Sequence, residues 1–179
     1  GNPKRKYPCT WELAETPAGH FIVVNTGLPN KLIFEAISEG VISELAGYAD
    51  SRREVRYGQE NSRIDILLTD SNKPDCFVEV KNVTLLEEDG KGYFPDAVST
   101  RGQKHLRELE REVSLGNRGV LVFCVSHTGI ESVSPAEHID PAYANILREV
   151  AKKGVEILAY RCDVSPQSVD VVRPIPVIL

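Results

Sequence analysis

The sequence lacks long hydrophobic runs, and its longest uncharged apolar stretch covers only residues 119–127. A helix that crosses a bilayer needs about 20 consecutive apolar residues, so the sequence predicts no membrane span. It also has no methionine and a single tryptophan. Its 41% hydrophobic and 26% charged residues are typical of a folded domain and exclude a disordered or collagen-like chain. Because Gly1 stands where a natural chain begins with methionine, we expect a fragment of a longer protein.

Cysteines are few and widely separated, so no Cys-x-x-Cys metal or redox pair exists. Cys76 and Cys124 lie within apolar runs, where cysteine usually acts as a small, buried and reduced hydrophobic residue. This usage predicts a cytoplasmic protein. The first residues, 2–6, have no apolar segment of the kind that a signal peptide needs.

Positive charge is also scarce, since the net charge is -5 at pH 7. The surface as a whole therefore does not attract a phosphate backbone, and any binding of nucleic acid must be local. Basic residues gather within residues 4–6, 52–56 and 101–107. Each cluster is either a solvated face or a local contact with nucleic acid.

Hydrophobic spacing predicts helices that cover a mixed β-sheet, which is an α/β class. Residues 10–15 and 20–25 suggest a hairpin, and residues 31–39 a helix that stops at Gly40. A second helix opens with a capping-box pattern at Thr100. The remaining expected elements are strands at 54–57, 62–69, 76–84, 119–126, 155–160 and 169–172, and a helix between Asp140 and Gly154.

Three charged residues on two neighbouring strands form the most informative pattern. Side chains alternate along a strand, so Glu79 and Lys81 share one face. A turn centred on residue 72, halfway between Asp65 and Glu79, places these two carboxylates opposite each other, with Cβ atoms about 4.5–5.5 Å apart. Like charges in this position destabilise a sheet, so either Lys81 or a metal ion must compensate them.

Two carboxylates suit a hard cation such as Mg²⁺, or Mn²⁺ in its place, that keeps several waters. Such an ion polarises a phosphodiester oxygen and lowers the pKa of bound water, while Lys81 orients that water or stabilises charge at phosphorus. The alternative is an ordinary ion pair of Glu79 with Lys81 or Arg63 on a solvent-facing strand. A register slip of one residue would place Asp65 and Glu79 on opposite faces.

The order of helix, Asp65, Glu79-Val80-Lys81, helix and strand resembles the PD-(D/E)xK nuclease core. The resemblance implies a restriction-endonuclease-like αβββαβ core in which Asp65, Glu79 and Lys81 are catalytic, and Asp65 and Glu79 hold the metal. The first helix of such proteins commonly adds another acid, for which Glu35 is the candidate. A solvent-facing Glu35 is the alternative.

Members of this superfamily often carry basic or amide side chains on the helix after the motif strand. Arg101, Gln103, Lys104 and His105 match that place and are the candidates for binding nucleic acid. Their position in the first turns of a helix suits phosphate, because helix N-terminal N–H groups attract anions. His105 alone is more often structural.

A second resemblance covers nearly the whole chain and is to the sugar fermentation stimulation protein family. The similar segments are residues 2–8, 11–13, 28–30, 54–55, 61–65, 78–85, 94–97, 101–102 and 104–106. Full-length members carry an OB-like domain before the Asn-Pro-Lys-Arg-Lys segment. Residues 1–27 are therefore expected to be a linker and β-hairpin that join that domain, and residues 28–179 to be the nuclease-like domain. An OB fold commonly binds single strands.

The family implies a DNA-binding protein linked to the regulation of sugar (maltose) use, and two functions stay open. One is a Mg²⁺-dependent phosphodiesterase that acts on DNA or another nucleic acid. The other is a non-catalytic DNA-binding regulator that keeps the nuclease scaffold. A protein-interaction module with an acidic face is a third alternative. We expect DNA as the partner and no membrane, and leave a homodimer open.

Overall fold

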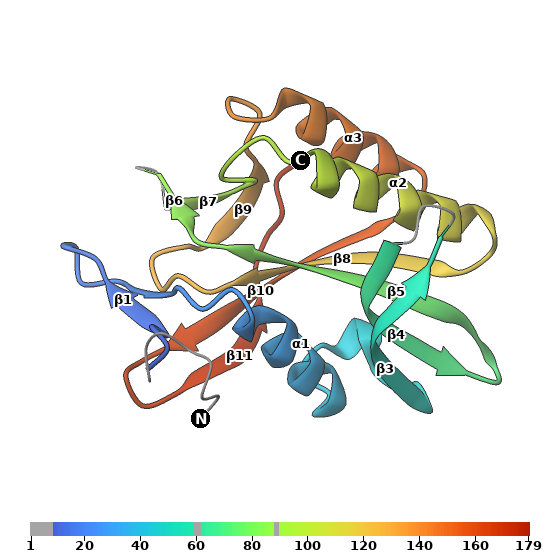
Figure 1. Ribbon diagram of the computed structural model, residues 1–179, viewed down its shortest axis with the longest axis horizontal. Coiled ribbons are helices and arrows are strands. Elements are labelled where there is room, and N and C mark those ends of the chain that lie inside the picture. Colours follow the sequence, from blue (N-terminus) through green and yellow to red (C-terminus); the bar gives the residue numbers. More distant parts are fainter. Residues whose placement is uncertain (1–8, 59–61, 88–89) are drawn as a thin grey trace.

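A computed structural model describes residues 9–58, 62–87 and 90–179 of the chain (Figure 1). Within these ranges a six-stranded mixed sheet has the order β11-β10-β8-β5-β4-β3. Its strands are β3 (Asp50–Tyr57), β4 (Ser62–Asp70), β5 (Lys73–Val83), β8 (Arg118–Val125), β10 (Glu156–Val164) and β11 (Val169–Pro174). Residues 1–8 of the predicted linker, with the first basic cluster, lie outside the described residues.

Helices lie on both faces of this sheet. Helix α1 (Leu28–Ser38) covers one face, and α2 (Thr100–Ser114) and α3 (Pro141–Lys152) lie together on the other (Figure 1). Strands β3, β4 and β5 form an antiparallel meander, after which α2 leads to β8, parallel to β5, and α3 leads to β10, parallel to β8. This is the predicted α/β order with its αβββαβ core. No helix of the described chain is both long and apolar enough to cross a membrane.

The smaller elements confirm one prediction and add an unforeseen sheet. Strands β1 (Leu13–Glu15) and β2 (Phe21–Val23) pair as the predicted antiparallel hairpin. Three further strands form a second sheet: β6 (Leu85–Leu86), β7 (Lys91–Phe94) and β9 (Ser132–Pro135). No strand is among the elements expected from the sequence in the segment that holds β6 and β7, where Glu, Asp and Gly residues interrupt the alternation of apolar side chains. This segment pairs because β9 offers β7 a parallel partner.

The helix ends follow their local chemistry. Asp140 caps α3 as expected, since its Oδ1 accepts from the Tyr143 N–H at 2.9 Å. The cap of α2 is Ser99 rather than Thr100, and its Oγ accepts from the Gly102 N–H at 3.0 Å. Both residues are good caps.

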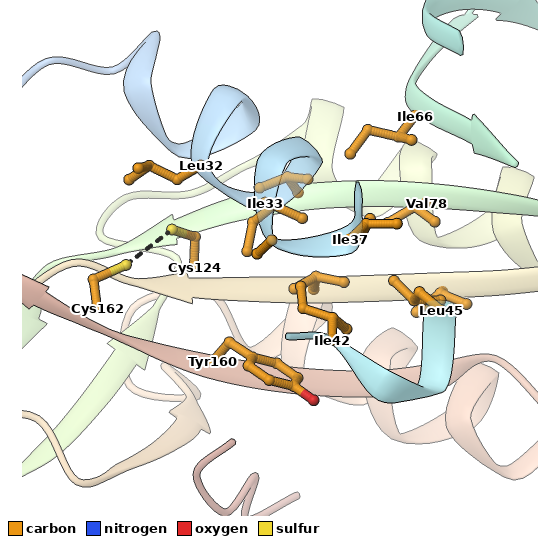
Figure 2. Close-up of a cluster of buried hydrophobic side chains, with 14 of the residues drawn as sticks. Leu32, Ile33, Ile37, Ile42, Leu45, Ile66, Val78, Cys124, Tyr160 and Cys162 are labelled. Carbon is orange, nitrogen blue, oxygen red and sulfur yellow. Dashed lines mark hydrogen bonds between the residues drawn. The ribbon is translucent and has the colours of Figure 1, made fainter. Parts of the chain in front are cut away.

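Two apolar clusters fill the space between the sheet and its helices. Figure 2 shows the first, in which Ile37 of α1 lies beside Val78 and Leu32 lies near Cys124. The second contains Phe77 of β5 and packs under α2 and α3. The side chains of β5 alternate between the two clusters, so Glu79 points to the face that α2 and α3 cover, opposite to Val78.

The cysteine prediction is also confirmed in part. Cys76, Cys124 and Cys162 are buried free thiols, and the sulfur atoms of the last two lie 3.6 Å apart (Figure 2). Cys9 is exposed. Burial raises the pKa of the Cys76 thiol to about 12, so it stays protonated at neutral pH and acts as a core residue.

Candidate functional site

Strands β4 and β5 separate at the level of Asp65 and Glu79. Their ladder includes Leu68 with Cys76, Leu67 with Phe77, and Ile66 with Val78, which is the predicted register centred on residue 72. Beyond Ile66 the backbone pairing stops, and the Asp65 side chain takes its place, because Oδ2 accepts from the Val80 N–H at 2.8 Å. A carboxylate therefore bridges the gap between the two strands.

The edge strand β3 is distorted at the same level. Arg53 pairs with Ile66 and Val55 with Ile64, and Glu54 between them has a φ of 54°, the one positive value among the described residues other than glycine. Left-handed backbone is unfavourable for such a residue, and strained positions gather at functional sites. The distortion lies directly opposite Asp65.

Asp65 is held from two sides. Its Oδ1 accepts from the Asn30 side chain of α1 at 2.7 Å, in addition to the Val80 N–H on Oδ2. Burial, and then the negative charge of Glu79, raise its pKa to about 6, although the Val80 N–H and Lys81 act in the opposite direction. Asp65 is thus an acid whose ionised form is costly and which a nearby cation would stabilise.

Glu79 is more deeply buried, with only 2% of its surface exposed. Its Oε1 accepts from the Lys81 ammonium at 2.6 Å and from the His105 ring nitrogen Nδ1. Burial acts against ionisation, but the hydrogen bond from His105 and the charge of Lys81 hold the pKa of Glu79 below its usual range. The other oxygen, Oε2, is buried and finds no hydrogen-bond donor among the described residues.

This geometry bears on the ordinary ion pair that the sequence offered as one alternative for Glu79. The ion pair with Lys81 exists, but it lies under α2 instead of on a solvent-facing strand. Arg63 is exposed and takes no part in it. An ionised carboxylate with one unpartnered, buried oxygen is unusual, since buried polar atoms are normally hydrogen-bonded.

The four predicted nucleic-acid contacts on α2 fall into two groups. Arg101 is exposed and Lys104 is half-buried at the surface. His105 is only 5% exposed, and Gln103 donates to both carboxylate oxygens of Asp140, at 3.1 and 3.2 Å. His105 and Gln103 therefore face inward in this structure, because the helix turns them toward the sheet and α3.

His105 connects the surface to Glu79. Its Nε2 accepts from Arg101 Nε at 3.4 Å, which leaves Nδ1 as the protonated nitrogen that donates to Glu79. Lys81 Nζ lies 3.4 Å from the same Nδ1. The sequence placed His105 on the correct helix but gave no signal that it reaches the carboxylate.

The structure does not bring Glu35 to the two carboxylates. Glu35 forms an exposed pair with Lys31 at 3.6 Å and lines a surface groove near Gln167. The residue of α1 that reaches Asp65 is Asn30. Asn30 and Glu35 are five positions apart, which places their side chains about 140° apart around the helix axis.

Sequence reasoning missed two buried tyrosines, Tyr57 and Tyr143, whose phenols are influenced by the charge of Glu79. The hydroxyls of Tyr57 and Tyr143 have no partner among the described residues. Burial, and then the negative charge of Glu79, raise the pKa of both phenols. These neutral donors are near Glu79, and aromatic spacing within a strand or helix did not distinguish them from ordinary core residues.

The donor set fits a divalent cation in part. No group of three or more His, Cys, Asp or Glu side chains suited to a metal is found in the described ranges. The candidate ligands are the carboxylates of Asp65 and Glu79. One of their oxygens, Glu79 Oε2, has no hydrogen-bond partner among the described residues. Mg²⁺ usually binds through one or two carboxylates and keeps its waters, so this pair meets the minimum that such an ion requires.

A mixed sheet of this strand order, with two carboxylates and a lysine where its central antiparallel strands separate, defines a restriction-endonuclease-like domain. The family model described as "Sugar fermentation stimulation protein RE domain" matches residues 27–168. The chain belongs to the sugar fermentation stimulation protein family.

Curated relatives agree with this assignment. A sugar fermentation stimulation protein homolog of Shewanella sp. (strain MR-4) is 58% identical over 176 residues, which are 98% of this chain and 75% of that protein. The homolog of Shewanella pealeana is 61% identical over the same shares. Among solved structures, that of Pyrococcus furiosus SfsA in complex with Ca²⁺ is similar, with a TM-score of 0.78 and 28% identity over 89% of this chain and 68% of that one.

Proposed function

We propose that this domain binds a divalent cation between Asp65 and Glu79 and hydrolyses phosphodiester bonds of DNA. The observation that carries the proposal is the arrangement where the strands separate: the Asp65 carboxylate replaces the backbone pairing at the level of Glu79, whose Oε2 is buried and has no partner among the described residues. The Ca²⁺ complex of the Pyrococcus furiosus relative supports a divalent ion. Mg²⁺ or Mn²⁺ is the ion proposed for the reaction.

In the proposed reaction each residue of the site has a separate role. A bound cation would lower the pKa of a water and polarise a phosphodiester oxygen. Asp65, held by Asn30 and the Val80 N–H, presents its carboxylate in one orientation. Lys81 holds an ammonium beside Glu79, where it stabilises negative charge that develops on the phosphate oxygens. His105 keeps Glu79 oriented and ionised.

The first test is a titration of the folded protein with Mg²⁺, Mn²⁺ and Ca²⁺, followed by thermal unfolding. An ion at 100 times its Kd stabilises the wild type by about 2.7 kcal/mol. Asp65→Asn should lose this effect, whereas Glu35→Gln should keep it, because Glu35 lies in the separate surface pair with Lys31. Equal stabilisation of wild type and Asp65→Asn would contradict the proposed metal site.

Lys81→Ala should separate binding from chemistry. Removal of its ammonium leaves both carboxylates and one less positive charge, so divalent-ion affinity should stay equal or rise. Cleavage of plasmid and of single-stranded DNA should fall about 10²- to 10³-fold, as when other transition-state donors are removed. Calorimetry and a gel assay measure the two effects. Undiminished cleavage would exclude Lys81 from the reaction.

One observation favours the non-catalytic DNA-binding regulator as a second candidate. Both Asp65 oxygens and one Glu79 oxygen already accept hydrogen bonds from the protein. In such a regulator the cluster would hold the strands together, and Arg101 and Lys104 would supply the grip on DNA. DNA retention without metal binding or cleavage would establish this function.

A further inference from the structure

Arginines occupy directly opposed positions of β3 and β4. Arg56 pairs with Arg63 in the antiparallel register, and both side chains are exposed. Their neighbours Val55, Tyr57 and Ile64 pack into the cluster under α2 and α3. Because side chains alternate along a strand, Arg56 and Arg63 point to the other face of the sheet, on which α1 lies.

Among the described residues nothing compensates the charge of this pair. Like charges directly opposite each other destabilise a sheet, and neither guanidinium is within ion-pair distance of a carboxylate of the described chain. Protection of an exposed edge strand by charge would explain an arginine on β3. It does not explain Arg63, because β4 lies between β3 and β5 and is not an edge.

Arg56 and Arg63 lie close to Asp65 along the strands. Arg63 precedes Asp65 by two residues on β4, which is about 6.6 Å along the strand. The Asp65 carboxylate lies in the gap between β4 and β5, and its Oδ1 is directed to Asn30 of α1, on the side of the sheet to which the two arginines point. A chain that presents one phosphate to Asp65 would bring a neighbouring phosphate toward the two arginines.

We propose that Arg56 and Arg63 form a clamp for one backbone phosphate of the nucleic acid that the Asp65–Glu79 site binds. The planar guanidinium donates two parallel hydrogen bonds to phosphate oxygens, a geometry that lysine lacks. The bound anion also cancels the repulsion within the pair. The clamp reads no base, so it adds grip without sequence preference. It rests on the proposed function only in that nucleic acid is the ligand.

Fluorescence anisotropy with a labelled oligonucleotide, single-stranded and duplex, tests the clamp across a salt series. Arg56→Gln/Arg63→Gln should raise the Kd at least about tenfold at low salt and reduce the slope of log Kd against log salt by about 0.9 for duplex. Runs with Ca²⁺ and with a chelator show whether metal affects binding. Each single variant should give a smaller effect in the same direction.

Arg52→Gln is the matched control. Arg52 lies on the same strand as Arg56 and is also exposed. It pairs with Leu67, whose side chain packs under α2, so Arg52 points to the opposite face from the clamp, and it has a carboxylate partner in Asp50 at 3.7 Å. Its removal should leave Kd within about twofold of wild type. The unliganded double variant should unfold at an equal or higher temperature than wild type, since the repulsion is gone. A merely structural role predicts a lower one.

The outcomes separate this inference from the proposed function. An unchanged Kd and salt slope in the double variant, or an equal loss in Arg52→Gln, overturns the clamp even if the wild type cleaves DNA. Absence of binding by the wild type overturns it as well. Binding that depends on Arg56 and Arg63 without any cleavage supports the clamp and argues against catalysis.

Discussion

Asp65→Asn should make the domain more stable at neutral pH, by about 1–3 kcal/mol, while it removes metal binding. The folded protein raises the pKa of Asp65 to about 6 from its ordinary value of 3.8. Ionisation in the folded state therefore costs up to about 3 kcal/mol relative to the unfolded chain. Asparagine has nearly the same shape and no charge, and the Asn30 amide can turn its oxygen toward the new NH₂ group.

The pH dependence of this effect has a definite sign. Because the folded state binds the Asp65 proton more tightly, the stability that this proton contributes is present below about pH 4 and is lost as pH rises through about 6. Urea unfolding at pH 8 and pH 5 should show a larger advantage of Asp65→Asn at pH 8. Asp50→Asn, on the exposed edge strand, is the control. A loss of stability at pH 8 would refute the assigned cost.

Glu79→Gln should have the opposite effect and destabilise the domain by about 3–5 kcal/mol. The substitution removes the negative charge that lies 2.6 Å from the Lys81 ammonium, and both side chains are largely buried. Loss of one partner of a buried ion pair typically costs about 3–5 kcal/mol, the value expected here. The His105 hydrogen bond is weakened as well. Chemical denaturation of wild type and variant at pH 7 measures the difference.

The lowered pKa of Glu79 also determines how the cost of Glu79→Gln depends on pH. The pKa of Glu79 is lowered, so the stability from its ionised form is present above the ordinary glutamate range and is lost only at lower pH. The cost of Glu79→Gln should thus stay constant above about pH 5. Glu156→Gln is the control, because Glu156 pairs with Arg118 and is more exposed than Glu79. Its substitution should cost about 1 kcal/mol or less of the free energy of unfolding. A comparable cost for both variants would mean that the Glu79 cluster is not specially buried.

Together the two substitutions distinguish a functional carboxylate from a structural one. The surroundings of Asp65 disfavour its ionised form, and carboxylates with such raised pKa values are frequent at functional sites. Glu79 is ionised with the help of His105 and Lys81. A stabilising effect of Asp65→Asn would favour the proposed metal site over a cluster that only holds β4 and β5 together.

Local patterns in the sequence determined much of this arrangement. The turn between two alternating runs set the register centred on residue 72, which the Ile66–Val78 pair confirms. Alternation along β5 placed Glu79 and Lys81 on one face, where they form an ion pair. Strand periodicity and turn composition are properties of neighbouring residues, so they can be read before any tertiary contact exists.

The tertiary structure alone decided what surrounds the carboxylates. Asn30, and not Glu35, reaches Asp65, because the way α1 crosses the sheet selects which side of the helix touches β4. His105 turns inward to Glu79 because α2 and α3 pack over that face. Periodicity gives the relative faces within one element, but the contacts between elements far apart in the chain depend on how whole layers pack. The burial that raises one pKa and leaves Glu79 Oε2 unpartnered arises only from that packing.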